Sequence, residues 1–161
     1  MSLARQIHEI LLAHDETVAT AESLTAGLVG AALTSVPGAS ATYRGGLIVY
    51  ATDLKASLAG VSLALLADRG AVDPDVASAL ASGARSRLGA SWGLGLTGVA
   101  GPDPQDGKPV GTLFVALAGP GDLTEVVSDV LPGDRVQIRA GAVDVALGLL
   151  RDTLAAREYR V

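Results

Sequence analysis

Two lysines, Lys55 and Lys108, stand out among the residues that could transfer protons, because the other ten of the twelve basic residues are arginines. A lysine can give up its proton when it is removed from water, whereas an arginine stays charged at any working pH. A desolvated lysine could therefore act as a general base. Chance retention explains the two lysines equally well, so their neighbours must decide.

Other common nucleophiles, bases and metal ligands are scarce. The chain has no cysteine, which excludes disulfides, thiolate metal sites and a cysteine nucleophile. Its two histidines, His8 and His14, are six residues apart, whereas a metal-binding pair on a helix needs a spacing of three or four. No carboxylate cluster has ligand spacing. We therefore expect neither a metal nor a cofactor.

Length and composition predict one soluble domain. The chain has 161 residues, 49% of them hydrophobic, which is enough for a core of its own. A net charge of −5 makes duplex nucleic acid an improbable partner. No segment has the apolar length of a membrane span, and the charged N-terminal residues do not resemble a signal peptide. We expect a cytoplasmic protein without membrane contact.

The hydrophobic pattern alternates between strands and helices, which favours an α/β fold, a three-layer α/β/α sandwich. Turn residues 119–122 join two strands as an antiparallel hairpin, so the sheet should be mixed and mostly parallel. The longest irregular stretch, 99–109, is a natural place for a site. Strands are expected at 17–22, 44–50, 91–98, 110–118 and 123–131. Helices are expected at 3–14, 24–35, 53–58 (capped by Asp53), 62–69 (capped by Ser62), 74–88 and 134–158.

Two nucleotide-binding motifs fail on inspection. Residues 93–98 match G-x-G-x-x-G, but prolines follow where the dinucleotide fingerprint needs a helix. Residues 101–108 resemble a P-loop, but five residues separate the glycines where four are required, and Pro109 replaces the magnesium-binding hydroxyl. At the strand-to-helix turn, Ser23 or Thr25 could be a simple N-cap, or the turn could hold a phosphate.

Five short motifs occur in one order along the chain. They are AES-x-T (21–25), PG-x-S (37–40), Gly-x-x-x-Tyr (46–50), LTG-x-AGP (96–102) and KPVGT (108–112). Together they resemble the CinA C-terminal domain family, also known as PncC-type nicotinamide-nucleotide amidohydrolases. The resemblance runs from about residue 3 into the last helix, so we expect a single domain of this kind over residues 1–161.

The resemblance implies hydrolysis of nicotinamide mononucleotide to nicotinic acid mononucleotide and ammonia without a metal, often by a homo-oligomer. It implies a serine nucleophile helped by a lysine and a tyrosine, which match Ser40, Lys55 and Tyr50. Ala26 departs from the usual glycine, and the 101–109 loop is short, which puts substrate contacts there in doubt. The implied substrate-binding positions are Ser23, Thr25, Gly27, Gly45, Gly46, Thr97, Gly98 and Gly101.

Alternatives remain open at this stage. Ser23 competes with Ser40 as nucleophile because its turn resembles a nucleophile elbow, although Ala21 and Thr25 occupy the places of the elbow glycines. We prefer Ser40 on the expectation that one strand and a turn bring Lys55 back to it. The domain could also hydrolyse another small amide, or act without catalysis as a partner protein in competence or DNA-damage responses.

Overall fold

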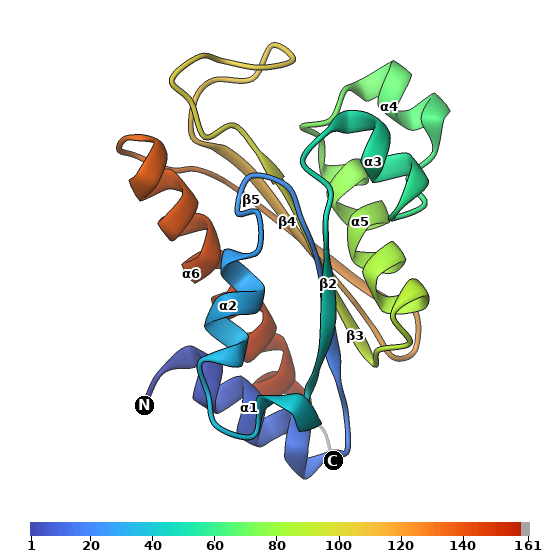
Figure 1. Ribbon diagram of the computed structural model, residues 1–161, viewed down its shortest axis with the longest axis vertical. Helices are drawn as coiled ribbons and strands as arrows, with labels where there is room; N and C mark the ends of the chain where they lie inside the picture. Colours follow the sequence, from blue (N-terminus) through green and yellow to red (C-terminus); the bar gives the residue numbers. More distant parts are fainter. Residues whose placement is uncertain (159–161) are drawn as a thin grey trace.

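A computed structural model describes residues 1–158 and shows a five-stranded sheet in the order β2-β1-β3-β4-β5 (Figure 1). Strands β1, β2 and β3 are parallel, β4 is antiparallel to β3, and β5 is antiparallel to β4. Four of the five strands therefore run in one direction, and the predicted mixed sheet with its hairpin is confirmed. The strands are β1 (Val18–Glu22), β2 (Tyr43–Ile48), β3 (Trp92–Gly98), β4 (Thr112–Gly119) and β5 (Leu123–Val130).

Helices cover both faces of the sheet, as the three-layer sandwich requires (Figure 1). One face carries α1 (Leu3–Ala13), α2 (Leu28–Thr34) and the long α6 (Arg135–Glu158). The other face carries α3 (Thr52–Ser57), α4 (Leu63–Arg69) and α5 (Pro74–Arg87), and a short 3-10 turn, η1 (Ala39–Ala41), precedes β2. No helix within residues 1–158 is both long and apolar enough to cross a bilayer.

Helix α5 lies unusually close to β3, which explains the glycine-rich motif of that strand. A Cβ atom on Gly93 would lie 2.0 Å from the carbonyl oxygen of Ala81, and one on Gly95 would lie 2.4 Å from the Ala81 nitrogen. Neither strand position can carry a side chain while α5 keeps this approach. These glycines therefore serve helix–sheet packing, and the rejection of a dinucleotide site is consistent with the structure.

Most predicted helix starts are confirmed, and two predictions are wrong. The side chains of Ser62 and Asp73 cap α4 and α5 by accepting from the N–H groups of Leu65 and Asp75. Helix α2 begins at Leu28 rather than at residue 24 because residues 24–27 form a tight turn instead. Asp53 lies in the first turn of α3, whose N-cap is Ala51 without a side-chain bond.

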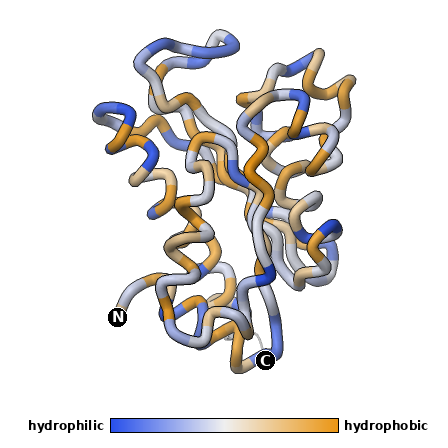
Figure 2. Tube along the Cα trace, in the orientation of Figure 1, coloured by the Kyte–Doolittle hydropathy of each residue, from blue (hydrophilic) through white to orange (hydrophobic). Residues whose placement is uncertain are grey.

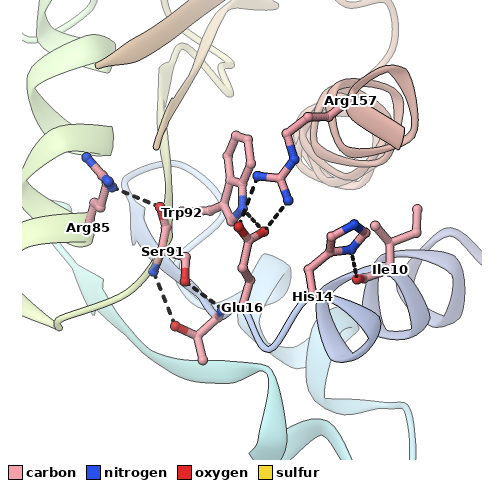
Figure 3. Close-up of polar contacts among 8 residues, drawn as sticks. Ile10, His14, Glu16, Arg85, Ser91, Trp92 and Arg157 are labelled. Carbon is pink, nitrogen blue, oxygen red and sulfur yellow. Dashed lines mark hydrogen bonds and ion pairs between the residues drawn. The ribbon is translucent and has the colours of Figure 1, made fainter. Parts of the chain in front are cut away.

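A polar cluster holds the C-terminal helix in place (Figure 3). It lies at the end of the molecule opposite loop 101–109. Glu16 accepts two hydrogen bonds from Arg157, at 2.8 and 3.0 Å, and one from the indole nitrogen of Trp92 at 2.8 Å. The guanidinium of Arg157 also stacks over the Trp92 ring, 5.2 Å from its centre.

Loop 101–109 itself is mostly hydrophilic (Figure 2) and projects beyond the carboxyl ends of β1, β2 and β3 (Figure 1).

Candidate active site

Lys55 is the most unusual ionisable residue of the site, because its side chain is only 2% exposed. Helix α3 carries it back under the end of β2, where its Nζ lies 2.8 Å from the carbonyl oxygen of Val49 and 3.1 Å from that of Tyr50. The third neighbour of Nζ is the hydroxyl of Ser23, at 2.9 Å. Burial lowers the pKa of Lys55 to about 8, and the Asp106 carboxylate opposes part of that decrease.

The arrangement around Nζ suits both forms of Lys55: the ammonium donates to all three neighbours, including the Ser23 hydroxyl, whereas the neutral amine can accept from that hydroxyl instead. The two carbonyl oxygens can only accept, so Lys55 must donate a hydrogen to each of them. A neutral amine then has its lone pair left, and the remaining neighbour is the Ser23 hydroxyl. Ser23 can therefore donate its proton to Lys55, which is the geometry of a nucleophile beside its general base.

Ser23 follows β1 directly and is held by the residue before it, Glu22. The Glu22 carboxylate is 1% exposed and lies beneath the turn between β1 and α2. It accepts hydrogen bonds at 2.7–3.2 Å from the Thr25 hydroxyl and from the N–H groups of Gly27, Val29 and Gly30. This carboxylate fixes the turn and accepts from the backbone N–H groups at the start of α2. The position of Ser23 is fixed as a result.

A cavity of about 260 Å³ opens in front of Ser23 and Lys55. It lies at the carboxyl ends of the parallel strands, where α/β proteins commonly bind ligands. Apart from Lys55, its charged lining consists of Asp103 and Arg135. The lining residues are Ser23, Leu24, Tyr50, Ala51, Thr52, Lys55, Ala71, Val72, Thr97, Gly98, Val99, Ala100, Gly101, Asp103, Gln105 and Arg135.

Tyr50 lines the cavity but does not offer its hydroxyl to Lys55. Its side chain is 57% exposed, and its hydroxyl accepts a hydrogen bond from Arg135 at 3.0 Å. Only the backbone carbonyl of Tyr50 reaches Lys55. Tyr50 is thus placed toward the mouth of the cavity, where it can meet a substrate.

The structure does not bring Ser40 to Lys55, contrary to the expected return of the chain. Ser40 is exposed in η1, before the amino end of β2, whereas Lys55 follows the carboxyl end of the same strand. The six residues of β2 separate the two by roughly 16 Å at the usual rise of a strand. One extended strand moves the chain away from Ser40, and the turn into α3 brings Lys55 back only as far as the carboxyl end of that strand.

The substrate-binding positions implied by the family resemblance divide into two groups. Ser23, Thr97, Gly98 and Gly101 line the cavity. Thr25, Gly27, Gly45 and Gly46 do not: Thr25 and Gly27 bind Glu22, and the other two lie within β2. The Thr97 hydroxyl donates to the carbonyl oxygen of Ala71 at 2.7 Å, so it fixes the cavity wall.

Sequence reasoning missed Arg135, Asp103 and Gln105, and it gave no weight to Glu22. Arg135 is 80 residues from Lys55 along the chain, and no spacing signal connects them. Glu22 did carry a signal, since an acidic residue at the end of a fully buried strand must find buried partners. Lys108, the second lysine, lies outside the cavity and pairs through its backbone with Gln105 at the tip of the loop. Across residues 1–158, no three acidic or histidine side chains gather as metal ligands would.

Comparisons with known proteins agree with this architecture. The model of the CinA C-terminal domain matches residues 1–154. A CinA-like protein of Frankia casuarinae is 54% identical over 154 residues, which cover 96% of this chain and 35% of that protein. One from Gloeobacter violaceus is 46% identical, with 93% and 36% covered. The chain thus spans about a third of the length of these curated relatives.

Solved structures match over nearly their full length. A competence/damage-inducible protein of Agrobacterium tumefaciens is 34% identical with a TM-score of 0.90, covering 95% of this chain and 93% of that one. A CinA superfamily protein of Klebsiella pneumoniae is 29% identical with a TM-score of 0.91, covering 96% of both chains. The α/β fold is therefore shared with this superfamily.

Proposed function

Since the chain belongs to the CinA C-terminal domain family, we propose that it is an amidohydrolase that converts nicotinamide mononucleotide to nicotinic acid mononucleotide and ammonia. The observation that carries the proposal is the buried contact between Lys55 and Ser23, 2.9 Å long. An amide is a poor electrophile, so its hydrolysis needs an activated nucleophile and a proton donor for the leaving nitrogen. A buried serine–lysine pair offers both.

In the first half of the proposed reaction, the Ser23 oxygen attacks the carboxamide carbon and its proton passes to Lys55. The carbon–nitrogen bond then breaks, and Lys55 returns the proton to the leaving nitrogen, which departs as ammonia. The remaining acyl group is an ester of Ser23. Lys55 is suited to both transfers because its pKa of about 8 lies near neutral pH.

In the second half, a water molecule attacks the ester carbon and gives a proton to Lys55. The ester bond breaks, the proton returns to the Ser23 oxygen, and a carboxylic acid is released, which ionises. Tyr50 lines the same cavity and is available for contact with the substrate. No step requires a metal, so the rate should be the same with and without a chelator.

The proposal is tested by incubating the purified chain with nicotinamide mononucleotide and measuring ammonia and nicotinic acid mononucleotide together. We expect equal amounts of both products, and only background from Ser23→Ala. Nicotinamide and unrelated small amides serve as comparison substrates. Ammonia from another amide but not from the mononucleotide would move the assignment to that substrate, and no ammonia from any of them would refute the proposal.

A further inference from the structure

We propose that Arg135 is the residue that recognises the anionic end of the substrate, so that the site selects amides of phosphorylated nucleosides over neutral ones. This inference rests on the proposed amidase function and adds a specificity determinant to it. The reacting serine and lysine form the buried floor of the cavity, and Arg135, the first residue of α6, lies exposed at its rim. The floor of the cavity thus carries the reacting groups, and the rim carries a guanidinium that can bind an anion.

The place where sequence reasoning would put a phosphate is already filled. The start of α2 offers N–H groups as a helix N-terminus does, but Glu22 accepts from Val29 and Gly30, and the carbonyl of Thr25 accepts from Leu28. A buried carboxylate there repels a second anion as well as using the donors. The phosphate must therefore bind elsewhere around the cavity.

Arg135 is the cation among the cavity's charged residues that remains available to an anion. Lys55 is buried and engaged with two carbonyl oxygens, and the remaining charge, Asp103, would repel a phosphate. Arg135 donates to the carbonyl oxygen of Gly101 at 2.6 Å and to the Tyr50 hydroxyl at 3.0 Å. Both partners are neutral, and within residues 1–158 Arg135 forms no ion pair.

The guanidinium keeps donors for a ligand. It has five N–H groups, and its two hydrogen bonds use two of them. Its planar fork suits bidentate binding of phosphate oxygens. The contacts with Gly101 and Tyr50 hold the side chain over the cavity, so little rotamer freedom remains to be lost when the anion binds.

Product binding gives a test that does not depend on turnover. Nicotinic acid mononucleotide and its nucleoside, which lacks the phosphate, are titrated by calorimetry into the wild type, Arg135→Gln and Arg151→Gln. Arg151 is a matched control because it lies on the same helix but bonds to Gln6 and Asp152, away from the cavity. We expect Arg135→Gln to weaken mononucleotide binding about 10- to 100-fold and nucleoside binding less than about 2-fold.

The outcomes separate this inference from the proposed function. Equal weakening of both ligands by Arg135→Gln, or no weakening of either, would overturn the role of Arg135 even if the protein is an amidase. Phosphate-selective weakening in a protein that releases no ammonia would support Arg135 as an anion site and refute the amidase. For an active enzyme, kcat/KM for the mononucleotide should fall by the same factor as the binding constant.

Discussion

Lys55 Nζ lies 2.9 Å from Ser23 Oγ, although the two residues are 32 positions apart and follow different strands. Strands β1 and β2 are parallel neighbours, so their carboxyl ends meet at the same edge of the sheet. Ser23 follows the first of them, and α3 brings Lys55 back beneath the second. The parallel pairing of β1 and β2 thus brings Ser23 and Lys55 together.

The first prediction concerns pH. Lys55 accepts a proton only when it is neutral, and its pKa is lowered to about 8. Below that value the protonated fraction grows, so kcat should fall tenfold for each pH unit, while above it kcat should level off. A pH–rate profile from pH 6 to 10 tests this. A profile that is flat from pH 6 to 9 would contradict a base with this pKa.

The same residue gives a sharper variant test. Lys55→Arg keeps the positive charge but cannot accept a proton at working pH, so turnover should fall about a thousandfold or more. The Ser23→Ala, Lys55→Arg double variant should be little worse than either single one, because the two residues act as a unit. Multiplicative losses in the double variant would show that they act independently.

Glu22 should be important for stability as well as for the position of Ser23. Glu22→Gln replaces one acceptor oxygen by an NH₂ group, which faces N–H donors that it cannot satisfy. We expect the free energy of unfolding to fall by about 1–3 kcal/mol. Urea denaturation measures it, with Asp144→Asn at an exposed position of α6 as the control. An unchanged transition would mean that the carboxylate is dispensable.

Ala26 offers a stabilising change. Its φ of +44° is in the left-handed region, where an alanine side chain is strained by about 1–2 kcal/mol. Ala26→Gly removes that strain but gives the unfolded chain more freedom, so a net gain of about 0.5–1 kcal/mol remains. Thermal unfolding should show a higher midpoint, and Ala31→Gly within α2 should show a lower one. A loss of stability in Ala26→Gly would contradict the strain.

The Glu16 cluster makes stability depend on pH in a defined direction. Burial alone would raise the pKa of Glu16, but hydrogen bonds from Arg157 and Trp92 outweigh it and lower the pKa below its usual 4.5. The ionised carboxylate therefore stabilises the fold above pH 4.5, and this contribution disappears as the pH falls through the lowered pKa. Because Arg157 is partly exposed, Glu16→Gln should cost only about 1 kcal/mol near pH 7. Urea titrations should show this difference shrinking toward pH 3; a constant difference would contradict the linkage.

Local patterns predicted the fold well, because they depend on neighbours in the sequence. The hairpin followed from the turn between two alternating strands, and the caps at Ser62 and Asp73 followed from residue type. The late start of α2 was missed because Glu22 replaces the expected side-chain cap from within a strand. Such long-range use of one carboxylate leaves no periodic signal.

Only part of the site could be predicted, because some of its residues belong to local motifs and others meet only through the tertiary structure. Lys55 and Tyr50 were identified from their motif and do line the cavity. The choice between Ser40 and Ser23 depended on where β2 begins and ends in space, which sequence spacing alone did not determine. Arg135 enters from a helix that starts far along the chain, so only the tertiary structure places it at the cavity.

The most direct test of the central proposal is the turnover number of Ser23→Ala beside that of Ser40→Ala, with nicotinamide mononucleotide at saturating concentration. If Ser23 is the nucleophile, Ser23→Ala should lose about a thousandfold or more while still binding the substrate. Ser40→Ala should keep kcat within about twofold, because its side chain is exposed at the far end of β2. A dead Ser40→Ala beside an active Ser23→Ala would contradict the account.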